Sequence, residues 1–404
     1  MKFFQIKLSL FLCFFVCAIL LNSVGIVILQ SINNYGITNV SASILEACKD
    51  LTIAIVSFFV ASLIPHFGYK KSMIIGLTLI TLACIAMPLL DSFWMTKLMF
   101  VCVGIAFALI KVSVYSTVGI ITNSPQEHAS LISWLEGTFQ IGVVLCYFVF
   151  SFFIERGTWL TTYWIIAAIS LLTIILLIFT NLDESRIEAS IEPKITRDFL
   201  HMLGLVKLPI VLVFILSIFI YVFIEQGIQS WLPTFNNSVL HLSDYASVIF
   251  ASIFALSIAT GRIASGFIMK KVYWEKVVII GLICCAVLIL IIMPMAQNIS
   301  GDSWSYLSIL TASLLPLIGF FIAPIYPTLC SSILSSQPAH LQSSMAGLII
   351  IFSALGGTIG SRVVSELFTI LGGEVAFYII LVPISLLILL VIPYARLHKK
   401  ANAS

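Results

Sequence analysis

Charged side chains are scarce in this sequence. Asp, Glu, Lys and Arg make up only 9% of its 404 residues, whereas hydrophobic residues make up 61% and the mean hydropathy is +1.16. A soluble globular chain carries about 25% charged residues, so this chain has too few to cover a water-facing surface. Lipid is therefore the expected solvent for most of it. Because lipid cannot hydrogen-bond to the backbone, only helices or a closed barrel can span it.

Sequence patterns for metal, nucleotide and nucleic-acid binding are also missing. The nine cysteines form no C-x-x-C pair, and the six histidines show no H-E-x-x-H spacing. No glycine-rich nucleotide loop is present through which ATP would drive the protein, and the net charge of +3 comes with no basic patch. These absences predict a protein that is not an enzyme and that has no metal, no cofactor and no nucleic-acid partner.

Apolar runs of about 20 residues dominate what is present. They are continuous and lack the alternation of a barrel strand, so they predict transmembrane helices. Turn residues and charges divide them into twelve expected spans, at residues 8–30, 43–65, 72–90, 94–121, 131–154, 159–181, 208–232, 245–269, 277–296, 304–333, 342–371 and 375–395.

The longest loop, from Asn181 to Lys207, carries nine of the chain's 37 charged residues and divides six spans from six. Of the lysines and arginines in the loops, only Lys97 and Arg156 fall on the side opposite the N-terminus. By the positive-inside rule, both termini are predicted to be cytoplasmic. The expected parts are an N-terminal six-helix bundle, a cytoplasmic central loop, a C-terminal six-helix bundle and a cytoplasmic tail, at residues 1–181, 182–207, 208–396 and 397–404.

Six plus six spans, a charged central loop and a short basic loop after span two resemble the major facilitator superfamily over essentially the whole chain. The loop after span eight is short and basic too, and repeated halves of this kind are common in secondary transporters. In place of the acidic residue of the family's loop signature, G-x-L-A-D-x-x-G-R-K, this chain has Pro65. The signature positions that this chain keeps are Leu63, Gly68, Lys70 and Lys71.

Two further features are similar to sugar and fucose-type permeases of that family. They are Gly261–Arg262 in span eight and the prolines of span ten, Pro324 and Pro327. The resemblance implies two six-helix bundles that expose a central solute site to each side of the membrane in turn. It also implies that spans one, four, seven and ten line this site, and that spans two and eleven, and five and eight, meet between the halves.

Ionisable side chains inside a span cost about 2.5–3.5 kcal/mol each, so each is a functional candidate. Span two carries Glu46, Lys49 and Asp50, and span eleven carries Arg362 and Glu366, all in the outer halves of their spans. One interpretation is that these charges neutralise one another within their own helices. The other follows the resemblance: Lys49 and Asp50 pair with Glu366 and Arg362 and latch the outer side shut.

A second set of charges lies toward the cytoplasm. Glu136 in span five has Gln140 one turn on, and Arg262 lies near the inner end of span eight. The resemblance brings these spans together, which predicts an inner latch between Glu136 and Arg262. The alternative is that Arg262 reaches the cytoplasmic surface or caps a local carbonyl group.

Lys111 lies close to the middle of span four. Gly104, Ala108, Lys111 and Tyr115 share one helical face, so small residues beside a cation can leave room for an anionic group. The resemblance places this span at the central site, and Lys111 and Tyr115 are therefore candidate substrate-binding residues. The alternative is a structural lysine that is paired with a neighbouring acid.

Span seven carries Tyr221, Glu225 and Gln229 on one stripe. A carboxyl group in low dielectric favours its neutral form, so Glu225 is the candidate for loading and releasing a proton. The alternative is a carboxylate held by Lys111 or by a cation of span eleven. Tyr221 and Gln229 are candidate substrate contacts, and Asn22 in span one either hydrogen-bonds substrate or makes an interhelical contact.

The expected function is alternating-access transport, with proton-coupled symport of a small anionic or hydroxylated metabolite as the first hypothesis. Proton-driven export of a metabolite, siderophore or drug is the second. A receptor or scaffold that has this fold but does not transport is the third. A monomeric, multi-pass protein of the bacterial inner membrane is expected, with the lipid bilayer and a small-molecule substrate as its partners and the proton gradient as its energy source.

Overall fold

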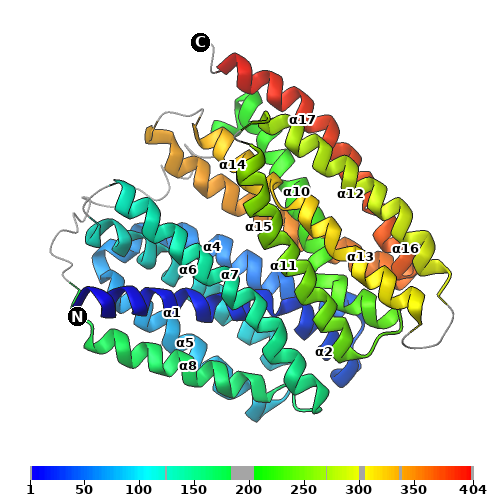
Figure 1. Cartoon of the computed structure of the whole chain (residues 1–404). Helices are drawn as coiled ribbons and strands as arrows, with labels where there is room; N and C mark the ends of the chain where they lie inside the picture. Colours follow the sequence, from blue (N-terminus) through cyan, green and yellow to red (C-terminus); the bar gives the residue numbers. More distant parts are fainter. Residues whose placement is uncertain are drawn as a thin grey trace. The chain divides into compact units, whose positions relative to one another are not determined.

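A computed structural model describes residues 2–122, 125–182, 204–269, 271–299, 305–335 and 339–401. These residues form helices joined by short turns and loops and include no strand, which confirms the predicted all-α membrane fold (Figure 1). The elements before the central loop are α1 (Lys2–Asn22), α2 (Val24–Tyr35), α3 (Asn39–Ala42), α4 (Ile44–Phe67), α5 (Tyr69–Leu90), α6 (Phe93–Ile121), α7 (Pro125–Glu155) and α8 (Thr161–Phe179). After it come η1 (Leu205–Lys207), α10 (Pro209–Ser238), α11 (Asp244–Ile268), α12 (Trp274–Gln297), α13 (Tyr306–Ile322), α14 (Ile325–Ser335), α15 (Ala339–Leu371), α16 (Gly373–Ile379) and α17 (Leu381–Ala401).

Eleven segments in the described part of the chain are long and apolar enough to span a membrane. The second predicted span, which is not among them, is α4, and this helix carries Glu46, Lys49 and Asp50. Its 24 residues rise about 36 Å at 1.5 Å per residue, more than the roughly 30 Å hydrocarbon core needs. The cytoplasmic position of the termini stays a prediction.

Three of the predicted spans are each built from two helices. Span one is α1 and α2, which are separated at Ser23; span ten is α13 and α14; span twelve is α16 and α17. Prolines explain two of these breaks, because Pro324 and Pro383 have no backbone N–H for the carbonyl group four residues earlier. At the first break, the Ser23 hydroxyl group donates to the carbonyl group of Leu20 at 2.8 Å.

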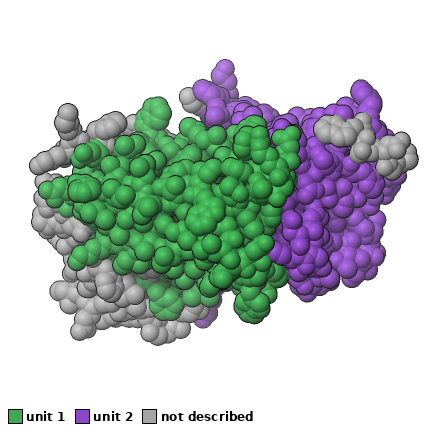
Figure 2. All heavy atoms as spheres, turned by 90° about the horizontal axis from the view of Figure 1, so that it is seen from below, with its two compact units in different colours: residues 1–24, 47–195 green, residues 25–46, 196–404 purple. Residues whose placement is uncertain are grey.

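The described helices form two compact units (Figure 2). Residues 1–24 and 47–195 form the first unit, and residues 25–46 and 196–404 form the second. Residues 25–46 therefore group with the C-terminal part of the chain. The predicted division into bundles at residues 1–181 and 208–396 stays a prediction.

In the first unit, α5 packs between α6 and α8, and α1 packs on α7. Small and hydroxylated side chains allow these contacts. The Thr81 hydroxyl group donates to the Ser170 hydroxyl oxygen at 2.8 Å, which joins α5 to α8. Gly76 of α5 lies against the Ala106 carbonyl group and the Ile110 side chain of α6. These are the contacts expected where lipid provides no hydrophobic force between helices.

In the second unit, α10 packs on α15 and α17, while α13 packs on α11 and α12. The contact between α10 and α15 is made backbone to backbone. A Cβ atom on Gly356 would overlap the carbonyl oxygen of Phe219, and one on Gly360 would overlap that of Phe223. Only glycine at these two positions permits this approach.

We predict that Gly360→Ala lowers the thermal stability of the protein, because the added methyl group must push α15 away from α10. Overpacking of this kind costs about 1–3 kcal/mol. The matched control is Gly266→Ala in α11, where nothing lies within 4 Å of the added atom. The measurement is the unfolding temperature of each variant in detergent. Equal temperatures for the two variants would contradict the close approach.

Candidate functional site

The candidate site in the second unit lies where α10, α11 and α14 meet around Glu225. The Tyr221 hydroxyl group donates a hydrogen bond to the Glu225 Oε1 atom at 2.9 Å. The Arg262 Nη2 atom lies 3.7 Å from the same oxygen. The Tyr221 side chain is fully buried, and the Glu225 side chain is 12% exposed. The site therefore holds a nearly buried carboxyl group between one hydroxyl donor and one cation.

Helix packing positions these three groups. Tyr221 and Glu225 are one turn apart on α10, so their side chains lie on the same face. Arg262 follows Gly261, whose missing side chain lets α11 lie directly against the Phe320 carbonyl group of α13. The tyrosine is held from its other side by Tyr326 of α14, with 5.8 Å between the ring centroids.

The arginine has donor capacity that this contact does not use. Its separation of 3.7 Å from the carboxylate is longer than a hydrogen bond. The buried Arg262 Nε atom has no hydrogen-bond partner among the described residues. Its side chain is 37% exposed. A guanidinium group in this state can accept an anion if Glu225 becomes neutral, because it presents several donors in one plane.

The predicted inner latch joined Arg262 to Glu136. The structure brings Arg262 to Glu225 instead, while the Glu136 side chain lies outside the described residues. The latch stays a prediction. No sequence pattern indicated the contact between Glu225 and Arg262, because these residues lie on different helices and spacing along the chain does not relate them.

Two other candidate substrate contacts, Gln229 of α10 and Asn22 of α1, are more weakly held. Gln229 continues the stripe of Glu225, is half-buried, and its amide group makes no hydrogen bond with the described part of the chain. Asn22 donates to the Ala18 carbonyl group at 2.9 Å, a bond within its own helix next to the break at Ser23. Gln229 can thus meet a solute directly, whereas Asn22 must first leave its carbonyl partner.

In the first unit, Lys111 of α6 is half-buried and lies among aromatic rings. Its Nζ atom is 5.3 Å from the ring centroid of Phe107 and 5.9 Å from that of Tyr115. Cation–π contacts of this kind offset part of the cost of a charge in a span. The Gly104 end of the same face is packed, because a Cβ atom there would lie 2.8 Å from the Lys49 carbonyl oxygen of α4. Small residues on this face therefore serve helix packing as well.

The charges predicted for the outer latch have partners close by. The Lys49 Nζ atom lies 3.5 Å from Asp50 Oδ1, and the Arg362 Nη2 atom lies 2.7 Å from Glu366 Oε1 one turn on. These distances match the first interpretation, that the charges are neutralised within their helices. The latch between spans two and eleven stays a prediction.

Two of these outer side chains also bind elsewhere in the second unit. The buried Glu46 carboxylate accepts a hydrogen bond of 2.6 Å from the Ser230 hydroxyl group of α10. The Arg362 Nη1 atom donates to the carbonyl oxygen of Val40, next to α3, at 2.9 Å. No sequence pattern indicates either contact, because a carbonyl group is present at every residue and a serine is common in any helix.

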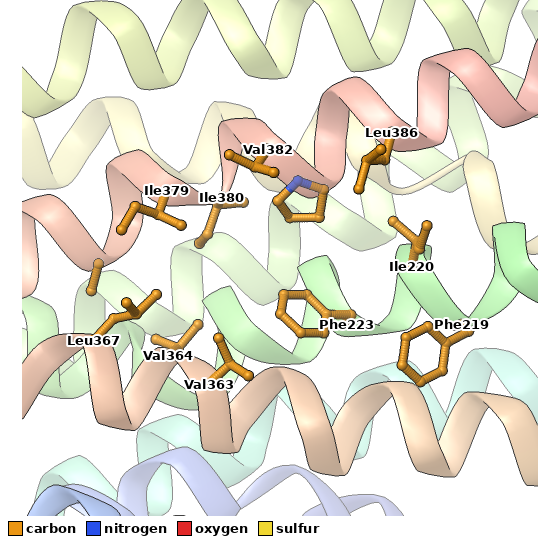
Figure 3. Close-up of a pocket in the computed structure, with 12 residues that line it drawn as sticks. Phe219, Ile220, Phe223, Val363, Val364, Leu367, Ile379, Ile380, Val382 and Leu386 are labelled. Atoms are coloured by element: carbon orange, nitrogen blue, oxygen red, sulfur yellow. The ribbon is translucent and has the colours of Figure 1, made fainter.

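An apolar groove of about 400 Å³ lies between α10, α15, α16 and α17 (Figure 3). Phe219, Ile220 and Phe223 form its α10 wall, and every other lining residue is apolar as well. At 100° per residue, these three side chains lie on the face of α10 opposite Glu225. A polar solute has no hydrogen-bond partner in this groove, so it is not the candidate site.

The loop signature residues have a structural role that the sequence did not reveal. Gly68 precedes α5 with a φ of +90°, a conformation that favours glycine. The Lys70 Nζ atom donates to the carbonyl groups of Ile178, in the last turn of α8, and of Thr180, just after it, at 3.0 and 2.7 Å. Lys71 is exposed. Lys70 therefore caps span six and adds a positive charge at the negative end of its dipole.

We predict that Lys70→Ala destabilises the protein by about 1 kcal/mol, because the last carbonyl groups of span six lose their donor. Lys71→Ala is the matched control, since it removes a neighbouring exposed lysine from the same loop. The unfolding temperatures of the two variants in detergent provide the measurement. A Lys71→Ala variant that loses as much stability as Lys70→Ala would contradict the capping role.

Comparison with known proteins places the chain in a family. Residues 10–361 match the family model described as Major Facilitator Superfamily. Among solved structures, a mutant of the nucleoside transporter NupG has 14% identity and a TM-score of 0.77, over 96% of this chain and 99% of that one. A D-xylose-proton symporter has 14% identity and a TM-score of 0.76, over 97% of each chain. A POT family transporter in complex with a thioalcohol-conjugated peptide has 14% identity and a TM-score of 0.77, over 98% and 96%. No curated protein matches the sequence.

Proposed function

Because this chain belongs to the Major Facilitator Superfamily, we propose that it is a proton-coupled symporter of a small anionic or hydroxylated metabolite. The chain is a multi-pass integral membrane protein and a transporter rather than an enzyme. The proton, the substrate class and the direction of transport are the proposal. The observation that carries it is the nearly buried Glu225 carboxyl group, held by Tyr221 and faced by Arg262.

The electrostatics of this site support coupling. With Glu225 ionised, its negative charge is balanced by Arg262, and an anion that approaches the arginine meets repulsion. With Glu225 protonated, the guanidinium charge is available to the anion. Proton binding then favours substrate binding, and thermodynamic linkage makes the effect reciprocal. A D-xylose-proton symporter is among the proteins with a similar fold, which agrees with this scheme.

The remaining features of the proposal follow from the family and the sequence. We propose that the protein works without a cofactor, draws its energy from the proton gradient, functions as a monomer and resides in a bacterial inner membrane with both termini cytoplasmic. A solute library screened for thermal stabilisation of the purified protein would identify the substrate, because a ligand that binds the folded state raises its apparent stability. Flux of that solute into proteoliposomes separates a transporter from a non-transporting receptor, and its direction separates import from export.

We predict that Glu225→Gln keeps substrate counterflow but loses uphill accumulation, because the amide resembles the protonated carboxyl group and cannot release a proton. Both activities are measured in proteoliposomes, counterflow without a gradient and accumulation with an imposed pH gradient. Glu155→Gln, at the exposed end of α7, is the control and should retain both. A Glu225→Gln variant that still accumulates substrate as the unmodified protein does would refute the coupling role.

We predict that Lys111→Ala weakens substrate binding by about tenfold or more, because an anion that enters a low-dielectric site needs a counter-charge. Lys97→Ala is the matched control: Lys97 lies on the same helix and its Nζ atom also lies over two rings, those of Phe93 and Trp94, at 4.6 and 4.5 Å. Substrate-dependent thermal shifts provide the affinities. Unchanged affinity in Lys111→Ala would mean that the lysine is structural, and the anion preference would then rest on Arg262 alone.

A further inference from the structure

Residues 25–46 form a segment that we call the strap: α2 from Gly25, α3 and the first turn of α4. The strap belongs to the same compact unit as residues 196–404, whereas the helices that continue it at both ends belong to the other unit (Figure 2). These are α1 before it and the rest of α4 after it. Because α1 and most of α4 are covalently continuous with the strap, contacts that hold the strap in its own unit also restrict the movement of these two helices of the other unit.

One carboxylate makes most of the polar contacts between the strap and α11. The Gln30 Nε2 atom and the Asn33 Nδ2 atom of α2 each donate to Asp244 Oδ2 at 2.9 Å. Asn237, at the end of α10, donates to Asp244 Oδ1 at 2.9 Å and to the Leu242 carbonyl group at 2.9 Å. In the described part of the chain, Asp244 makes no ion pair. Two amide groups of the strap thus hold one oxygen of Asp244, and the Asn237 amide at the end of α10 holds the other.

Further contacts fasten the strap along its length. At its start, Gly25 lies close to α10, since a Cβ atom on it would lie only 3.0 Å from the Ser230 carbonyl oxygen. In its middle, the Val40 carbonyl group accepts from Arg362 at 2.9 Å. At its end, Glu46 accepts from Ser230 at 2.6 Å.

The two ends of the strap differ. The helix is interrupted at Ser23, so α1 can change direction relative to α2 there. No interruption exists at the other end, because α4 runs continuously through Glu46. Movement of α4 with its own unit must therefore pull the strap away from α10, α11 and α15.

We propose that Gln30, Asn33 and Asp244 form a releasable clasp. The protein opens to solution at the end that carries the clasp only when the amide groups of Gln30 and Asn33 leave Asp244. The proposal rests on alternating access, which is part of the proposed function, and gives gating roles to three residues outside the site around Glu225. Under the orientation predicted from the loop charges, this end is external.

The chemistry of the clasp suits repeated opening. Amide-to-carboxylate bonds are charge-assisted, so they are stronger than bonds between neutral groups. When the strap leaves, water can replace its amides at Asp244 Oδ2, while Asn237 keeps the other oxygen in place. No buried charge is left without a partner, which is the main penalty when a buried ion pair is broken.

The test needs neither substrate nor a proton gradient. In a background with all nine cysteines replaced, Ser31→Cys puts a thiol at a fully buried position of the strap, and its reaction with a membrane-impermeant maleimide reports strap opening. Gln30→Glu places a second carboxylate beside Asp244, so the two negative charges repel. Asp244→Asn places an amide donor against the donor amides of Gln30, Asn33 or Asn237. We expect each to raise the labelling rate about tenfold, the size of effect for one lost charge-assisted hydrogen bond.

Combining the two substitutions separates a clasp from a general structural role. With both present, the new side chain at position 244 keeps an oxygen toward Asn237 and presents an amide to the new carboxylate at position 30. We expect labelling to slow again, below the rate of either single variant. The control is Asn298→Ala. The side chain of this exposed asparagine bonds, within the described part of the chain, only the Pro294 carbonyl group, so the substitution should leave the rate unchanged.

A second reporter excludes unfolding as the cause of faster labelling. Ser217→Cys lies fully buried in α10 of the same unit and should stay unreactive in every variant. Three results would each overturn the clasp. The single variants could label at the unmodified rate, the double variant could show the product of the two single effects, or labelling could accelerate equally at both reporters. Those outcomes leave the accumulation test of Glu225 unaffected, and failure of that test leaves the clasp standing.

Discussion

Inside a bilayer no water competes for hydrogen bonds, so polar groups in the spans of this chain must find partners within the protein. Many hydroxyl groups donate to the carbonyl group four residues earlier in their own helix, as Thr78, Thr117, Ser217 and Thr369 do. Charged groups obey the same constraint with other partners: a tyrosine hydroxyl group for Glu225, aromatic rings for Lys111 and a serine for Glu46. The candidate site and the clasp are both results of this requirement.

Much of the architecture could be predicted from the sequence because lipid makes the apolar run a direct signal of a helix. The twelve runs and the family loop signature led to the all-α fold of the superfamily. The same signal is insensitive to what lies inside a run. Span one reads as one continuous segment, yet the chain breaks at Ser23 and its two halves pack in different units. The summed hydrophobicity of a run is the same whether or not one residue in it, such as Ser23, leaves helical geometry.

Side-chain partners were harder to predict, for a different reason. Helical periodicity tells which residues of one helix share a face, and it correctly grouped Tyr221 with Glu225. It does not tell which helix lies opposite, so the approach of Arg262 to Glu225 was not foreseen. Bonds to backbone carbonyl groups, such as those of Lys70 and Arg362, leave no pattern at all in the acceptor's sequence. The clasp was missed for a related reason: Gln30 and Asn33 resemble ordinary polar residues at the end of a span.

The glycine contact between α10 and α15 has a mechanical consequence. Side chains between two helices can rotate and so absorb small axial shifts, but Gly356 and Gly360 leave backbone lying directly on backbone. The two helices must then shift as one body. Glu225 lies two residues beyond Phe223 on one helix, and Arg362 lies two residues beyond Gly360 on the other. A displacement of α10 at the Glu225 carboxyl group therefore also moves Arg362 of α15, which holds the Val40 carbonyl group. The rigidity of the contact at the two glycines sets how closely the two movements follow each other.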